Sequence, residues 1–117
     1  MASGPKHPTL LSHDVYFSLH DPSPAAAAKL VEACKMHLLR HPGVLFFAAG
    51  TLCRELERPV NDRGFDVALH IVFRDKASHD AYQKAAGHIR FIEENKPDWK
   101  QVRVFDSFVE RLEAEGP

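Results

Sequence analysis

The sequence has few cysteines, a single tryptophan and no long apolar run. Cys34 and Cys53 stand far apart, without the close spacing of metal-binding or redox-active cysteine pairs. No apolar stretch approaches the roughly 18 residues of a membrane-spanning helix, and the first ten residues lack the apolar segment of a secretory signal peptide. These absences predict a cytoplasmic protein that does not cross a membrane.

An excess of one charge is also absent. Fifteen basic and sixteen acidic residues give a formal net charge of −1, and no basic stripe predicts a nucleic-acid-binding surface. The 117 residues and the 44% hydrophobic content are those of one globular domain with its own core. We place that domain at residues 11–110, between a flexible N-terminal segment, 1–10, and a charged C-terminal tail, 111–117.

Hydrophobic periodicity predicts the element order β-α-β-β-α-β. Period-two patterns indicate strands near residues 11–20, 44–53, 64–73 and 101–109, and apolar stripes indicate helices over 24–40 and 75–86. Gly87 is expected to break the second helix, and a further short helix follows it as far as Lys96. The strand at 44–53 is apolar at nearly every position, which predicts burial of both its faces.

This order predicts an α+β fold of the ferredoxin-like type, a four-stranded antiparallel sheet with the helices on one face. The opposite face would present apolar and aromatic side chains, a surface too apolar to leave in water. A second copy of the chain is the simplest cover, so we expect a homodimer formed through the sheet faces. The residues expected on that face are Tyr16, Ala68, His70, Val72 and Phe105.

Several short motifs occur in an order that matches a known family. They are His13 in the first strand, Pro42-Gly43-Val44 at the entry to the second, Gly64-Phe65-Asp66 before the third, AYQKAAGHIRF from Ala81, and VRVFDSF from Val102. With these motifs the chain resembles the stress-responsive A/B-barrel (Dabb) domains, dimeric α+β barrels whose ferredoxin-like subunits pack sheet against sheet. A plant polyketide cyclase that forms olivetolic acid is a distant functional relative in that family.

The resemblance implies a catalytic pair at Tyr82 and His88, with His13 and Trp99 in the same pocket. A neutral imidazole can remove a proton beside a carbonyl, and a phenol can hydrogen-bond the oxyanion that forms. In the alternative interpretation, His88 caps a helix end and Tyr82 is a core residue. The pocket is expected between the sheet and the helices, with further ligand-binding walls from Val15, Phe17, Leu69, Ile71, Val102 and Val104.

Three functions are compatible with these residues. The first is a protein that binds a small hydrophobic carbonyl or phenolic compound, or a cyclase-like enzyme acting on one. The second is a non-catalytic dimeric stress protein with a filled core, and the third is a cofactor-free monooxygenase acting on an activated phenol. No metal or organic cofactor is expected, because the eight histidines are dispersed and His37 and His41 lack the Glu of His-Glu-x-x-His. A cavity beside His88 would separate the first and third functions from the second.

Overall fold

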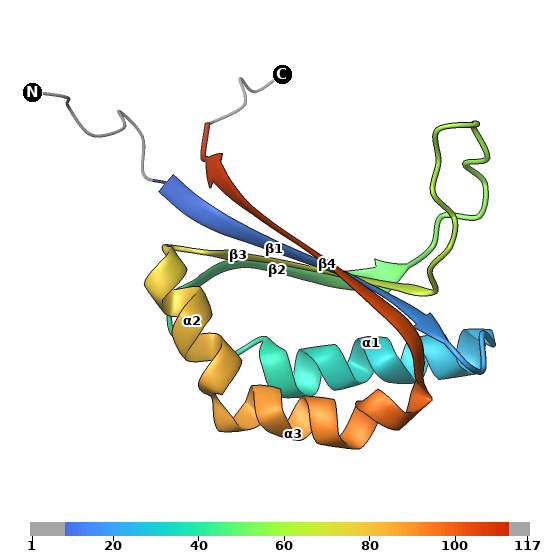
Figure 1. Ribbon diagram of the computed structural model, residues 1–117, viewed down its shortest axis with the longest axis horizontal. Helices are drawn as coiled ribbons and strands as arrows, with labels where there is room; N and C mark the ends of the chain where they lie inside the picture. The colour runs from blue at the N-terminus through green and yellow to red at the C-terminus, as the bar shows by residue number, and fades with distance from the viewer. Residues whose placement is uncertain (1–8, 113–117) are drawn as a thin grey trace, which may run out of the picture.

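The computed structural model describes residues 9–112 as a four-stranded antiparallel sheet with helices packed on one face (Figure 1). The strands β1 (Thr9–Leu19), β2 (Val44–Thr51), β3 (Val67–Phe73) and β4 (Trp99–Glu110) lie in the order β2-β3-β1-β4. The helices are α1 (Pro24–Leu38), α2 (Lys76–Lys84) and α3 (Ala86–Asn95), and a short 3-10 helix, Lys96–Asp98, follows α3. The predicted ferredoxin-like α+β architecture is therefore confirmed.

The ends of the elements differ from the predicted ranges by a few residues. Strand β1 already begins at Thr9, and β4 begins at Trp99, two residues before its expected start. The rest of the predicted flexible segment and most of the predicted charged tail lie outside the described residues. Among residues 9–112, no helix is both long enough and apolar enough to cross a membrane.

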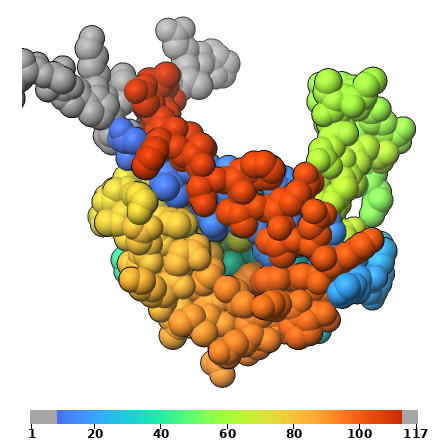
Figure 2. Space-filling view, viewed as in Figure 1, coloured from blue at the N-terminus to red at the C-terminus, as the bar shows by residue number. Residues whose placement is uncertain are grey.

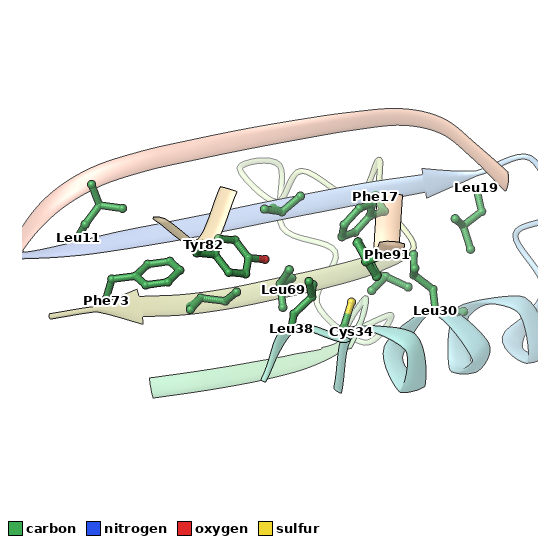
Figure 3. Close-up of a cluster of buried hydrophobic side chains, with 14 residues drawn as sticks. Leu11, Phe17, Leu19, Leu30, Cys34, Leu38, Leu69, Phe73, Tyr82 and Phe91 are labelled. Atoms are coloured by element: carbon green, nitrogen blue, oxygen red, sulfur yellow. The ribbon is translucent and has the colours of Figure 1, made fainter. Parts of the chain in front are cut away.

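Every second side chain of β1 and β3 points into the core. Val15 lies directly opposite Leu69 in the antiparallel ladder, and Phe17 lies opposite Val67, so the same sides of both strands turn toward the helices. Leu30, Cys34 and Leu38 of α1 and Phe91 of α3 complete this cluster, which Figure 3 shows between the strands and the helices. Each fully buried aliphatic or aromatic side chain contributes about 1.5–3 kcal/mol to stability.

Helix α1 begins where the sequence predicts a cap. The Ser23 hydroxyl accepts a hydrogen bond from the Ala26 N–H at 3.2 Å, and Pro24 occupies the first helical position. Cys34 is fully buried in the apolar stripe of this helix, and burial raises the pKa of its thiol to about 12. The thiol is therefore a packing group rather than a nucleophile.

The interruption between α2 and α3 lies at Ala85, so the prediction that Gly87 breaks the helix is wrong. Ala85 is extended (φ −69°, ψ 146°); its N–H donates to the Tyr82 carbonyl at 3.1 Å, and its own carbonyl accepts from Ile89 at 3.1 Å. Gly87 lies in the first turn of α3, where a Cβ atom would stand 2.7 Å from the carbonyl oxygen of His37. Glycine at this position allows α3 to approach α1 closely.

The outer face of the sheet receives no helix from the described chain (Figure 1). Phe46 of β2 and Phe105 of β4 are 55% and 53% exposed there. The predicted burial of both faces of β2 is wrong for the single chain, because only its inner face packs on the core and no helix of the described chain covers its outer face. The outer face is therefore an apolar surface without a cover from its own chain.

The long connection between β2 and β3, residues 52–66, rises on this outer side (Figure 1). Asp62 accepts a hydrogen bond from the Arg103 guanidinium at 2.7 Å, and the Phe65 ring meets the Tyr16 ring edge-on, with centroids 4.9 Å apart. These two contacts attach the connection to β4 and β1.

Candidate functional site

A cavity of about 180 Å³ lies between the inner face of the sheet and the helices. In Figure 2, a hollow between β4 and the α2–α3 segment exposes atoms of deeper elements. Strands β1 and β3 provide the back wall, α2 and α3 provide the opposite wall, and β4 provides the rim. Apolar walls with a few convergent polar groups are the usual composition of a small-molecule site.

All predicted site residues except Ile71 line this cavity. Ile71 is fully buried in the core, in register with Phe47 and His13, and contributes no surface to the cavity. Val102 and Val104 remain 37% and 49% exposed, because β4 is one of the two edge strands, so they form the rim of the cavity. The lining residues that the sequence did not predict are Leu38, Gln83, Phe91 and Ile92.

His88 lies in the first turn of α3, and its ring meets the Tyr82 ring edge-on with centroids 4.7 Å apart. Burial lowers the pKa of His88 below its usual value near 6.5; a hydrogen bond with the Gln83 backbone opposes this shift, and the charges of His13 and His79 add to it. The imidazole is therefore neutral at neutral pH, the form that can accept a proton.

Tyr82 is only 2% exposed, and burial raises the pKa of its phenol far above the usual range. The hydroxyl is thus protonated at neutral pH and available as a hydrogen-bond donor. Figure 3 shows it pointing along the inner face of the sheet, and within the described residues no hydrogen bond joins it to His88. Tyr82 is therefore both a core residue and a cavity wall.

The two histidines at the end of α1 and just beyond it do not share a site. The His41 ring packs edge-on against Tyr82, with centroids 5.6 Å apart. The His37 Nε2 atom lies 3.3 Å from a carboxylate oxygen of Glu94, where it joins α1 to α3.

A second polar group borders the cavity at His13 of β1. Its Nδ1 atom lies 2.5 Å from the Asp106 carboxylate on β4, and its ring centroid lies 5.0 Å from that of His79 on α2. The potential metal-ligand atoms of these three residues all lie within 4.8 Å of one another. The His79 nitrogens, however, also contact Asp80 at 3.1 Å and Gln83 at 3.3 Å. Each of the three side chains thus has a partner in the protein, and we assign no metal to the group.

Trp99 closes the cavity at the start of β4. Its ring packs against those of Phe17 and Phe91, with centroids 5.0 Å and 5.7 Å away. Its Nε1 atom and the Nδ1 atom of His88 are the two buried side-chain polar atoms in residues 9–112 that lack a hydrogen-bond partner. Buried polar atoms in proteins are nearly always hydrogen-bonded, and both of these residues line the same cavity.

Comparison with known proteins agrees with this architecture. The family described as "Stress responsive A/B Barrel Domain" matches residues 11–109. A search of curated proteins found no match.

Solved structures share the fold at low sequence identity. A Dabb family protein with a ferredoxin-like fold from Mesorhizobium loti superposes with a TM-score of 0.70 at 20% identity, over 85% of this chain and 95% of that one. Hydroxynitrile lyase from Passiflora edulis gives 0.70 at 18% identity, over 92% and 99% of the chains. A dimeric ferredoxin-like protein of unknown function from Thermobifida fusca gives 0.70 at 15% identity, over 86% and 92%.

Proposed function

The chain belongs to the stress-responsive A/B barrel domain family, and from that premise we propose that it binds a small hydrophobic carbonyl or phenolic compound in the cavity between sheet and helices. The observation that carries the proposal is the cavity itself, which has apolar walls and the neutral imidazole of His88 on one side. In such a site the apolar walls hold the body of a ligand, and the polar groups fix its orientation.

The size of the cavity limits the ligand. An apolar protein cavity of about 150 Å³ accommodates benzene, and this cavity measures about 180 Å³. A single six-membered ring with one or two small substituents therefore fits, whereas a filled core would leave no space for it. This space argues against a purely structural role.

A cyclase-like activity is the second candidate, and the contact between the Tyr82 and His88 rings favours it. His88 would take a proton from the carbon beside a ligand carbonyl, and the Tyr82 hydroxyl would donate to the resulting oxyanion after a rotation toward the ligand. General-base catalysis of this kind typically accelerates a reaction by about 10²–10⁴-fold. Binding needs only the cavity, whereas the reaction also needs the two groups to act together.

The proposal includes a homodimer assembled through the outer faces of the sheets. Apolar side chains on that face, among them Phe46 and Phe105, are half exposed in the single chain. The protein from Thermobifida fusca that shares the fold is described as dimeric. Stable interfaces bury about 1,200–2,000 Å² in total, an area that two facing four-stranded sheets can supply.

The binding proposal can be tested with the fluorescence of the single tryptophan. Trp99 lines the cavity, so titration with cyclohexanone, a small apolar ketone, should change its emission in a saturable way. His88→Ala should weaken this binding while leaving thermal stability nearly unchanged. The matched control is His20→Ala, because His20 is exposed and lies outside the cavity lining.

The absence of a saturable signal would contradict the proposal, and so would equal weakening by the two substitutions. The proposal includes no metal, so dialysis against a chelator should leave the titration unchanged.

A further inference from the structure

Trp99 carries a polar atom that the packing of the core does not explain. Its ring fits between Phe17 and Phe91 as an apolar wall, but the buried Nε1–H has no acceptor within the described residues. An indole N–H can only donate, and leaving a buried donor unpaired costs about 1–3 kcal/mol. A phenylalanine would provide a similar wall without that cost.

The second unpaired buried atom, His88 Nδ1, belongs to another lining residue of the same cavity. Trp99 opens β4 and His88 lies in the first turn of α3, so the two nitrogens come from different elements. The rest of the cavity lining is mainly apolar, with Val15, Leu69 and Ile92 among its members. A molecule that satisfies both nitrogens needs an apolar body and two polar groups.

We propose that Trp99 is a specificity-determining residue, whose Nε1–H donates to an oxygen on a single-ring ligand that carries a second polar group toward His88. This inference rests on the proposed binding function and narrows its ligand class to rings with two oxygen substituents, such as hydroxyaryl carbonyl compounds. One oxygen accepts from Trp99, and the other contacts the neutral imidazole. The cavity volume of about 180 Å³ sets the limit at one ring.

The test compares two para-substituted rings of similar shape, 4-hydroxybenzaldehyde and p-xylene, by isothermal titration calorimetry. Calorimetry replaces fluorescence here because the informative variant, Trp99→Phe, removes the only tryptophan. Phenylalanine keeps an aromatic wall and deletes the donor. Since 4-hydroxybenzaldehyde has an oxygen at each end, either orientation in the cavity presents an acceptor to Trp99.

Trp99→Phe should weaken binding of 4-hydroxybenzaldehyde about 2- to 12-fold more than binding of p-xylene, which corresponds to the loss of one neutral hydrogen bond. The matched control is Ile92→Val, which trims another wall residue without touching either nitrogen. It should change the affinity for both compounds by the same factor.

Two outcomes overturn the inference, and they can be told apart. If the wild-type protein binds both rings and Trp99→Phe weakens them equally, Trp99 is only a wall, and the binding function stands. If the wild-type protein binds neither ring nor cyclohexanone, the proposed function fails, and this inference fails with it. Thermal denaturation of both variants identifies any loss of binding that comes from unfolding.

Discussion

At the scale of single residues, the most informative features are buried polar atoms that have no hydrogen-bond partner. His88 has a buried, unpaired Nδ1 atom and lines a mainly apolar cavity. Burial disfavours its protonated form, and the nearby charges of His13 and His79 act in the same direction. A histidine in this position weakens the fold under acid and holds its imidazole in the base form near neutrality.

The lowered pKa of His88 makes the protein less stable as the pH falls. Because the pKa of His88 is lowered in the folded state, the unfolded chain binds the proton first as the pH falls below about 6.5. Stability should therefore decrease from that pH downward and stop decreasing, for this group, once the folded protein is also protonated. Urea denaturation between pH 7.5 and pH 5 would measure the free energy of unfolding of the wild type and of His88→Gln. The wild type should lose more of it on acidification than the variant. A variant that loses stability on acidification as steeply as the wild type would contradict this assignment.

At the scale of elements, the close approach of α3 to α1 depends on Gly87. A Cβ atom there would stand 2.7 Å from the His37 carbonyl oxygen, which belongs to the helix backbone and cannot rotate away. Gly87→Ala should therefore lower the free energy of unfolding by about 1–3 kcal/mol, the usual cost of overpacking. Glu93→Ala is the matched control, because Glu93 is exposed on the same helix, and it should change stability by less than about 0.5 kcal/mol. Chemical denaturation of both variants checks the comparison, and equal stabilities would contradict it.

The elements themselves could be predicted from sequence because their patterns are strong. Every second residue from Val67 to Phe73 is a large apolar one, which predicts the buried side of β3, and the structure buries that side. The exact helix break could not be predicted, because Gly87 resembles a stop signal and only the position of α1 shows that it serves close packing. Ala85, where the chain does turn, carries no local signal for an extended conformation.

The walls that the strands give to the candidate site could be predicted as well, since inward-facing positions of β1, β3 and β4 follow from period two, whereas Tyr82, His88 and Trp99 were predicted from the family resemblance. The pairing of His13 with Asp106 could not, because it depends on the register between two strands distant in sequence. The unpaired state of Trp99 Nε1 is likewise a property of three-dimensional packing that a sequence does not display.

At the scale of the whole molecule, the proposed homodimer depends on the outer sheet face. Val72 lies on this face, in register with Phe46 of β2 and Ser12 of β1. Val72→Glu would bury an unpaired charge in each copy, at a cost of at least about 2 kcal/mol, and should weaken the dimer about 30-fold or more. Ile89→Glu is the control, because Ile89 is 47% exposed on α3, away from the sheet face. Light scattering across a concentration series measures the molar mass of the wild type and of both variants. A monomeric wild type, or a Val72→Glu variant that dimerises as the wild type does, would contradict the proposed dimer.

The central claim is that the cavity between sheet and helices holds a small aromatic ligand. Nuclear Overhauser effects between 4-hydroxybenzaldehyde and methyl-labelled protein test this claim most directly, because the cavity and the outer face of the sheet carry different methyl groups. We expect contacts from the ring protons to Leu69, Ile92 and Val104, which line the cavity. Contacts confined to Leu45 and Val72 on the outer face, or no contacts at ligand saturation, would contradict the account.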